Sequence, residues 1–512
     1  MEKDDFPASR WLVPLGLLIG AALLLLFPLA KPIWTDEGIS IGWGRTPLSL
    51  ILSGRFGSPD ALPLHPLYLA LVGRPLGDTL AIHRLISALP AAVGLWYIYL
   101  IGRRISERVG VLTLWLAALS PGLILFDRMS RYHGLTALLG VMSCYYFLRL
   151  LSEEDRKLPI KYGIVTALLL LSYVLSVFVV AAQFVFLVLY WKRTPRPIAI
   201  FIAMAVATLV FAGYFIPNML RANRDLVGVN VKDPSMGQGI NGFLRRFFLP
   251  VYVFCVGETL SPWKVWFSLT GCGIALSTFV MGIWSLRKRP ELLMPLACFA
   301  VVLLSALATS SKLGSSQTVG SMAKRVSFVL PMFYLAVATG MFSIRQTTVR
   351  NALAAVLLII SSISTFNYFA GKEFLNPNYT VNWNEAITVI KEKQLDDNTI
   401  IFSSAESSLM YYMDENGVAN RLIGKVRGVD ELKDALASKK YKHLWLVGRD
   451  RGDRIAVADF EAVRKLVLDS GAHQVYAGGV YPRTDDEKKW LGKALKRDVW
   501  PYYVVLELYE LP

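Results

Sequence analysis

WLVPLGLLIGAALLLLFPLA, residues 11–30, carries no charged side chain. A helix of about 20 apolar residues is what a bilayer core requires, so this stretch predicts a membrane-spanning helix. A cleaved signal peptide is the alternative interpretation, but the apolar run is long and no small-residue cleavage site is evident. We therefore expect an uncleaved first span.

The rest of the chain has the same character. Of its 512 residues, 54% are hydrophobic and only 18% are charged, and the mean hydropathy is +0.45, well above that of an ordinary soluble domain. The apolar run 162–191 is too long for one span and is divided near SYVLS, residues 172–176. Further spans are predicted at 81–101, 110–126, 134–151, 161–174, 176–191, 197–217, 263–286, 291–310, 325–343 and 351–370, about eleven with the first.

Basic residues predict the topology. Lys or Arg occurs in each of the connections GRRISER (102–108), EEDRK (153–157), KRTPRP (192–197), RKRP (287–290) and RQTTVR (345–350). The positive-inside rule assigns such connections to the cytoplasm. The segments 31–80, 127–133, 218–262 and 311–324, and everything after residue 371, are then expected on the outer face. The same rule accounts for the net charge of +16, so we expect no nucleic-acid partner.

Two further features define the organisation of the chain. SIGWGRTPLSLILSG, residues 40–54, predicts an amphipathic helix lying on the membrane within the first outer loop. From residue 380 onward, charges appear between short apolar runs. NTIIFSS (398–404), KHLWLVG (442–448), HQVYAGG (473–479) and YYVVLELYEL (502–511) predict strands, and 382–394, 428–438 and 457–470 have helical spacing.

This alternation of strands and helices predicts a small α/β domain with a largely parallel sheet. The expected organisation is therefore a transmembrane domain over 1–371, with the long outer loop at 31–80, and an extracytoplasmic α/β domain over 372–512. The four cysteines (Cys144, Cys255, Cys272 and Cys298) indicate neither a disulfide framework nor a metal site.

The first candidate site residues lie in the first outer loop. KPIWTDEGIS, residues 31–40, places Asp36 and Glu37 side by side just beyond the first span. A carboxylate at the bilayer surface is partly desolvated, which raises its pKa and makes it a competent proton acceptor. His65 follows in the same loop, held between Pro63 and Pro66. The alternative is that these polar residues only end a helix at the headgroup level.

Basic residues at other outer connections form the second group. FDRMSRYHGL, residues 126–135, crowds Asp127, Arg128, Arg131 and His133 into a short connection, and SMAKRVSFVLP brings Lys324 and Arg325 to the start of a late span. The positive-inside rule disfavours arginine on the outer face, so arginines there need a local reason. Phosphate binding is one such reason, because a guanidinium pairs with phosphate through two parallel hydrogen bonds. A lipid-linked phosphate would satisfy these cations. Snorkelling to lipid headgroups is the alternative.

These motifs in this order resemble those of the bacterial membrane glycosyltransferases with the GT-C fold, of the kind that includes protein O-mannosyltransferases and lipid A aminoarabinose transferases. The resemblance rests on the acidic pair after the first span, H-P-x-Y in the first outer loop and R-Y after the third span. It also rests on a basic residue opening the span that runs into VLPMFYLA, and on the tail that starts NWNEAITVIKEKQ. It covers nearly the whole chain.

The resemblance implies transfer of a sugar, with inversion, from a polyprenyl-phosphate donor to a protein, lipid or glycan acceptor at the outer face of the inner membrane. It implies Asp36 as the catalytic base, Glu37 and His65 as residues that shape the site, and Asp127 as a second acidic residue. The residues that it implies for the donor phosphate are Arg128, Arg131, Tyr132, Lys324 and Arg325. It also allows a divalent metal ion, with Asp36, Asp127 and His65 as ligands.

A transporter or lipid flippase is the main alternative, because it would also need many spans and cations facing a lipid phosphate. Transporters usually place ionisable residues or broken helices near the bilayer midplane, whereas here the charges gather at helix ends. A polytopic scaffold is a third possibility, but it leaves the acidic pair unexplained. The sugar, the acceptor and the carrier length stay open.

Overall fold

The structure, a computed structural model, describes residues 8–57, 61–225, 240–312, 321–372, 374–375, 377–403, 407–423, 428–450, 454–480 and 503–512. These residues form two compact units. The first unit comprises Met1–Pro28 and Ile41–Tyr368, and the second comprises Leu29–Ser40 and Phe369–Pro512. Of the predicted outer loops, 226–239 and 313–320 lie outside the described residues.

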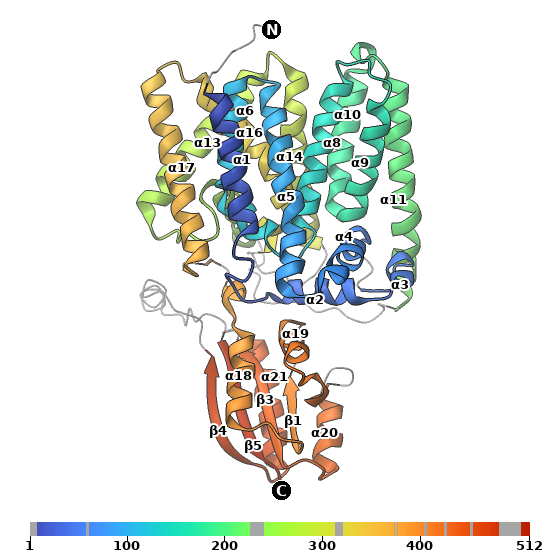
Figure 1. Cartoon of the computed structure of the whole chain (residues 1–512), viewed down its shortest axis with the longest axis vertical. Helices are drawn as coiled ribbons and strands as arrows, with labels where there is room; N and C mark the ends of the chain where they lie inside the picture. Colours follow the sequence, from blue (N-terminus) through green and yellow to red (C-terminus); the bar gives the residue numbers. More distant parts are fainter. Residues whose placement is uncertain are drawn as a thin grey trace. The chain divides into compact units, whose positions relative to one another are not determined.

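The first unit is a bundle of helices (Figure 1). Its α-helices are α1 (Ser9–Leu25), α3 (Leu48–Leu52), α4 (Leu64–Tyr68), α5 (Leu80–Arg103), α6 (Glu107–Ala118), α7 (Pro121–Asp127), α8 (His133–Leu150), α9 (Leu158–Ser172), α10 (Val177–Leu189), α11 (Pro197–Asp225), α12 (Ile240–Val256), α13 (Val265–Leu286), α14 (Met294–Lys312), α15 (Ser321–Val326), α16 (Leu330–Ser343) and α17 (Thr347–Phe369). Helix α2 (Thr35–Arg45) begins in the second unit and ends in the first.

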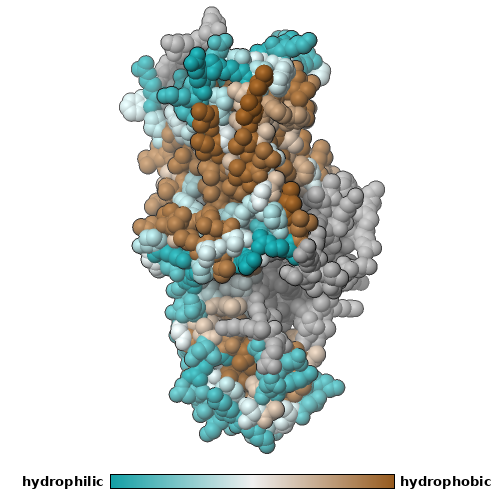
Figure 2. Space-filling model, turned by 90° about the vertical axis from the view of Figure 1, so that its right-hand side faces the viewer, coloured by the Kyte–Doolittle hydropathy of each residue, from teal (hydrophilic) through white to brown (hydrophobic). Residues whose placement is uncertain are grey.

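Within the part of the chain that the structure describes, six helices are long and apolar enough to cross a membrane, or up to seven if the pair α6 and α7, bent by 56°, counts as one span. Helices α1, α9 and α10 are apolar but shorter. Each of the eleven predicted spans contains a helix, while the count of eleven stays a prediction. Figure 2 shows hydrophobic side chains gathered along the helices of this unit, with hydrophilic ones toward the helix ends.

Three connections test the local predictions. The long apolar run does break where expected, because α9 ends at Ser172, Tyr173 is extended and α10 begins at Val177. The segment 40–54 is helical in two pieces and not in one, and its position on the membrane stays a prediction. Two helices, α2 and α3, are separated at Thr46 and Pro47, since a proline restricts the residue before it to extended conformations.

Helix α12 was not predicted, since it falls in the segment 218–262 that we expected to be a loop. Its C-terminal part, from Val253 to Val256, is buried in the core of the unit. The apolar stretch there is too short to cross a bilayer, so its length gave no reason to expect a helix. The helix is instead stabilised by packing against neighbouring helices, which the sequence alone does not reveal.

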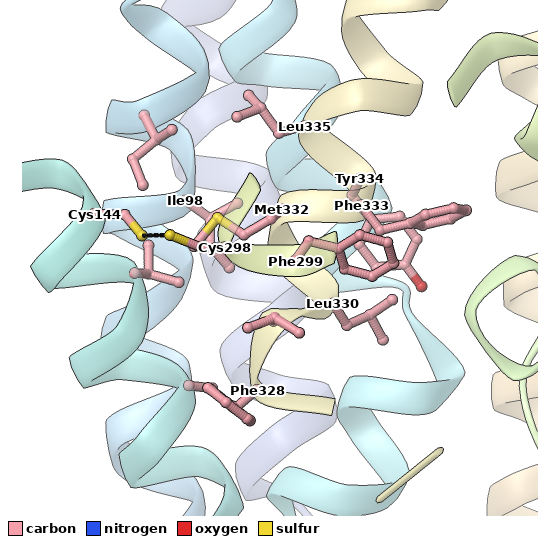
Figure 3. Packing of buried hydrophobic residues seen from close by; sticks show 14 of the residues in the cluster. Ile98, Cys144, Cys298, Phe299, Phe328, Leu330, Met332, Phe333, Tyr334 and Leu335 are labelled. Atoms are coloured by element: carbon pink, nitrogen blue, oxygen red, sulfur yellow. Dashed lines mark hydrogen bonds between the residues drawn. The ribbon is translucent and has the colours of Figure 1, made fainter. Parts of the chain in front are cut away.

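The core of the first unit is packed closely by aromatic and sulfur-containing side chains (Figure 3). Phe299 and Phe333 lie with ring centroids 5.9 Å apart, and the Tyr334 hydroxyl lies 2.7 Å from the Ser120 hydroxyl. The thiols of Cys144 and Cys298 are free, with their sulfur atoms 4.0 Å apart (Figure 3).

Helices α13 and α16 approach each other through glycines. A Cβ atom added at Gly340 would lie 1.7 Å from the Thr278 carbonyl oxygen, and one added at Gly282 would lie 2.0 Å from the Ala336 carbonyl oxygen. Only glycine allows two helix backbones to come this close, and small residues are the usual means of helix association in membranes.

The second unit contains a five-stranded sheet with the order β2-β1-β3-β5-β4 (Figure 1). Its strands are β1 (Thr399–Ser403), β2 (Leu422–Ile423), β3 (His443–Asp450), β4 (His473–Val480) and β5 (Tyr503–Glu510), and its helices are α18 (Trp383–Lys393), α19 (Ser407–Glu415), α20 (Val429–Ala437) and α21 (Arg454–Asp469). All four predicted strands and three predicted helices are present.

The expected largely parallel sheet is only half right. Strands β2 and β3 pair parallel with β1, whereas β5 pairs antiparallel with both β3 and β4. The chain passes from β3 through α21 to β4 at the far edge, and β5 then enters between them in the opposite direction. Strand direction depends on this pairing and not on the local alternation of apolar residues.

Side chains that alternate along the strands cover the two faces of the sheet. On one face, Ile401 and Trp445 pack against Leu409 of α19 and residues of α18. On the other face, Leu444 and Leu446 pack against residues of α20 and α21. The sheet therefore has a core on both faces, and α19 is fixed to one of them.

Candidate active site

The acidic pair lies in the first turn of α2, in the second unit. Glu37 is fully buried, its carboxylate accepts the Trp34 backbone N–H at 3.0 Å, and the Lys31 ammonium lies 4.0 Å away. A Glu at the third helical position that binds back to the N-cap amide is half of a capping box. Asp36, by contrast, is only partly buried. The geometry favours a structural role for Glu37 and leaves Asp36 as the more accessible acid.

His65 lies in α4, in the first unit, and is buried. Its Nε2 atom is 3.3 Å from the Ser87 hydroxyl of α5. Burial first, then the positive charge of Arg131 and the neighbouring His83, lower the pKa of His65 to about 3. His65 is therefore neutral near pH 7 and exchanges no proton there, so it can position a neighbour but has little power as a general acid.

Arg131 and Tyr132 form the centre of a cationic and aromatic cluster in the first unit. The Arg131 guanidinium lies 5.1 Å from the centroid of the Tyr132 ring, and that ring stacks on Tyr173 with centroids 4.5 Å apart. Arg131 and Arg325 both interact electrostatically with Tyr173, and Arg131 does so with His65. Segments far apart in the sequence are thus brought together here.

Tyr173 is the residue of this cluster that the sequence analysis missed. It sits in the break between α9 and α10, where an extended residue interrupts the helices, and its ring also contacts Phe328 edge to face at 5.7 Å. The break itself was predicted from the length of the apolar run. It could have drawn attention to Tyr173, because a side chain at a helix break is free to face a neighbouring loop.

Arg128 is buried, and its guanidinium binds the C-terminal end of α1. Its guanidinium donates to the backbone carbonyls of Leu23, Leu24 at 3.1 Å and Phe27 at 2.6 Å, and to the Tyr368 hydroxyl at 3.2 Å. The last carbonyls of a helix have no partners within it, and a cation at that end is favourable. This arrangement favours a structural role for Arg128 over the predicted contact with the donor phosphate.

Asp127, at the end of α7, is buried among apolar side chains. It lines a small pocket with Leu24, Leu95, Ile124 and Pro331 among its neighbours. Its Oδ1 atom has no hydrogen-bond partner among the residues that the structure describes. A carboxyl oxygen buried without a partner carries a desolvation cost, so these apolar surroundings give no support to the predicted role of Asp127 as a second catalytic carboxylate.

Lys324 and Arg325 lie at the end of α15, and both are partly buried. The Ser327 hydroxyl donates to the Lys324 carbonyl at 2.9 Å and fixes the turn into the next helix. Arg325 interacts electrostatically with Tyr173.

The ligand set suggested for a divalent metal ion was Asp36, Asp127 and His65. Among the residues that the structure describes, no group of three or more His, Cys, Asp or Glu side chains could hold a metal ion. Asp36 belongs to the second unit, whereas Asp127 and His65 belong to the first, and the suggested ligand set stays a prediction.

Part of the chain is similar in sequence to a known protein family. The sequence profile described as dolichyl-phosphate-mannose-protein mannosyltransferase matches residues 59–216. Among curated proteins, no sequence matches this chain.

Solved structures are similar over nearly the whole chain. ArnT from Cupriavidus metallidurans in the apo state superposes with a TM-score of 0.54 at 12% identity, over 98% of this chain and 98% of that one. The same protein bound to undecaprenyl phosphate gives 0.51 at 11% identity, again over 98% of each chain. The oligosaccharyltransferase of Archaeoglobus fulgidus gives 0.50 at 13% identity, over 85% of this chain and 69% of that one.

These similarities confirm the predicted resemblance to GT-C glycosyltransferases. The chain has their fold, it is a multi-pass membrane protein, and the matches indicate glycosyltransferase activity.

Proposed function

We propose that this protein transfers a sugar from a polyprenyl-phosphate donor to a protein, lipid or glycan acceptor on the outer face of the cytoplasmic membrane. The observation that carries the proposal is the Arg131 guanidinium over the Tyr132 ring, which stacks on Tyr173, with Arg325 near enough to interact electrostatically with Tyr173. Guanidinium groups in this part of the fold suit a phosphate, because each can bind one through paired, charge-assisted hydrogen bonds. The undecaprenyl phosphate bound by ArnT is the kind of ligand that such a cluster fits.

The chemistry assigns a step to each group. Asp36 accepts the proton of the acceptor hydroxyl as the acceptor oxygen bonds to the anomeric carbon. The bond from that carbon to the phosphate oxygen breaks, and its electron pair stays on the lipid phosphate. Attack opposite the leaving group inverts the configuration. Arg131 and Arg325 stabilise the negative charge that develops on the phosphate, and a general base contributes typically about 10²–10⁴-fold.

Asp36 is preferred to its neighbour as the base because Glu37 is buried and engaged with Trp34 and Lys31. In this proposal His65, neutral near pH 7, shapes the site. Arg128 holds α1, and Lys324 adds positive charge near the donor. A transporter is not favoured, since the proteins that share the fold are glycosyltransferases.

The test is a transfer assay with the purified protein in proteoliposomes. Undecaprenyl phosphates carrying different sugars are supplied with membrane extract as the acceptor source, and the products are identified by mass spectrometry. Asp36→Asn is expected to lower transfer about 10²-fold or more and to retain binding of undecaprenyl phosphate. Asp430→Asn, at a well-exposed carboxylate of α20, is the control and is expected to match wild type.

Arg131→Met is expected to weaken the binding of undecaprenyl phosphate. Equal transfer by wild type and Asp36→Asn would remove the base from the mechanism. Movement of the lipid across the bilayer without sugar transfer would favour the flippase.

A further inference from the structure

The segment that carries the acidic pair, Leu29–Ser40, belongs to the same compact unit as the α/β domain. Residues 41–368 of the chain separate it from Phe369, where the rest of that unit begins. Among the residues that the structure describes, α19 and the short helical turn Pro377–Thr380 both contact this segment.

Helix α19 contacts the start of α2 at three successive points. The Ile33 backbone N–H donates to the Tyr412 hydroxyl at 3.2 Å, and the Thr35 and Ser408 hydroxyls lie 3.5 Å apart. Gly38 faces the first residue of α19 so closely that an added Cβ would lie 2.6 Å from the Ser407 carbonyl oxygen. These points lie before, beside and after Asp36 and Glu37.

Tyr379 contacts the segment from the second element. The Trp34 ring meets the Tyr379 ring edge to face, with centroids 5.2 Å apart, and the Lys31 ammonium lies 5.4 Å from the Tyr379 centroid. Trp34 and Tyr379 are both buried. The same Lys31 pairs with Glu37, which caps α2, so Tyr379 is connected to the first turn of the helix.

The domain can act as a rigid support because α19 is itself fixed. Leu409 and Met413 are fully buried in the core that α18, α19 and the sheet share. A shift of α19 would open that core, which is packed too closely to yield without cost. Because α19 is fixed to the sheet and contacts the start of α2, the sheet also fixes the position of the start of α2.

We propose that the α/β domain is a positioning element for the catalytic base: α19 and Tyr379 hold the start of α2 and so set the orientation of Asp36. This inference rests on the proposed function, since it takes Asp36 as the base. It assigns to the domain a role in the chemical step, whatever part the domain has in choosing the acceptor. A catalytic group displaced by about 1 Å can lose about 10²-fold in rate.

Two variants test the contacts without touching Asp36. Gly38→Ala forces α2 away from the Ser407 carbonyl, and we expect it to lower kcat about 10- to 100-fold. Tyr412→Phe removes only the hydroxyl that accepts the Ile33 amide, and we expect a smaller loss of about 3- to 10-fold. The KM for the polyprenyl-phosphate donor and the binding of undecaprenyl phosphate are expected to stay at the wild-type values, because Arg131 and Arg325 are unchanged.

The matched control is Tyr509→Phe. Tyr509 is a fully buried tyrosine of the same domain, its hydroxyl donates to Glu507 at 2.8 Å, and it touches none of the residues that hold the segment in the contacts described above. We expect it to lower the stability of the domain slightly and to keep kcat. If it lowers kcat as much as Tyr412→Phe at equal folded fraction, the effect is one of domain stability and the inference is wrong.

A cross-link gives a readout that needs no catalysis. In Thr35→Cys/Ser408→Cys, the sulfur atoms replace hydroxyl oxygens 3.5 Å apart, so a disulfide should form under mild oxidation and be found by peptide mass spectrometry. All four native cysteines lie in the first unit, whereas both substituted positions lie in the second. Absence of the cross-link would overturn the inference.

The two proposals can fail separately. If Asp36→Asn abolishes transfer while Gly38→Ala and Tyr412→Phe keep the wild-type kcat, the positioning role fails and the proposed function stands. If Asp36→Asn transfers sugar like wild type, the proposed base fails and the positioning inference falls with it, even where the cross-link forms.

Discussion

Replacing Arg128 with methionine separates a structural arginine from a ligand-binding one. Methionine keeps much of the length of the side chain and removes every donor. Four hydrogen bonds are lost, three to the carbonyls that end α1 and one to Tyr368. Each buried polar group left without its partner costs about 1–3 kcal/mol, and several lose theirs here, so a loss of about 3–5 kcal/mol is expected. At about 2 °C for each kcal/mol in a large domain, the unfolding temperature should fall by about 6–10 °C.

Arg131→Met is the matched comparison. Arg131 is only partly buried, and its cation–π contact with Tyr132 is worth about 0.5–1 kcal/mol, so its unfolding temperature should fall by about 2 °C or less. Loss of one charge-assisted bond of about 1.5–3 kcal/mol should weaken the binding of undecaprenyl phosphate about 10- to 150-fold. Arg128→Met should bind it like wild type.

The measurements are thermal unfolding in detergent, followed by tryptophan fluorescence, and equilibrium binding of undecaprenyl phosphate at a temperature where all three proteins are folded. The reasoning is refuted if Arg128→Met unfolds at the wild-type temperature and binds the lipid weakly. That result would place the Arg128 guanidinium on the phosphate and away from α1.

Two further outcomes are expected. Gly340→Ala should destabilise the protein by about 1–3 kcal/mol, because its Cβ would meet the Thr278 carbonyl at 1.7 Å. Thermal unfolding checks this against Gly213→Ala, where nothing lies within 4 Å of the added Cβ, and equal stability of the two variants would contradict it. Since burial holds the pKa of His65 at about 3 in the folded protein, against about 6.5 when unfolded, the unfolded state binds the proton first on acidification. The stability that neutral His65 contributes is present above pH 6.5 and is lost as the pH falls toward 3, by up to about 1.4 kcal/mol per pH unit. His65→Gln should therefore lose less stability than wild type between pH 7 and 5, and parallel losses in the two proteins would show that His65 is not buried in its neutral form.

Much of the fold followed from local patterns. The length of apolar runs located a helix in each of the eleven predicted spans, and the break at Tyr173 followed from a run too long for one helix. Alternating apolar residues located β1, β3, β4 and β5 within one or two residues. These features depend on residues that are close together in the sequence, so the length and periodicity of apolar runs predict them. Helix α12 and the antiparallel β5 did not follow, because both depend on packing against distant segments.

The candidate site divides in the same way. The sequence by itself identified the residue types: an acidic pair beyond the first span and basic residues at several connections. Only the tertiary structure decided which of them have other partners. Arg128 binds the end of α1, Glu37 caps α2, and Arg131 lies over the Tyr132 ring that stacks on Tyr173. The physical reason is that charge and hydropathy are properties of a residue, whereas a hydrogen-bond partner is supplied by whichever distant backbone the fold brings within about 3 Å.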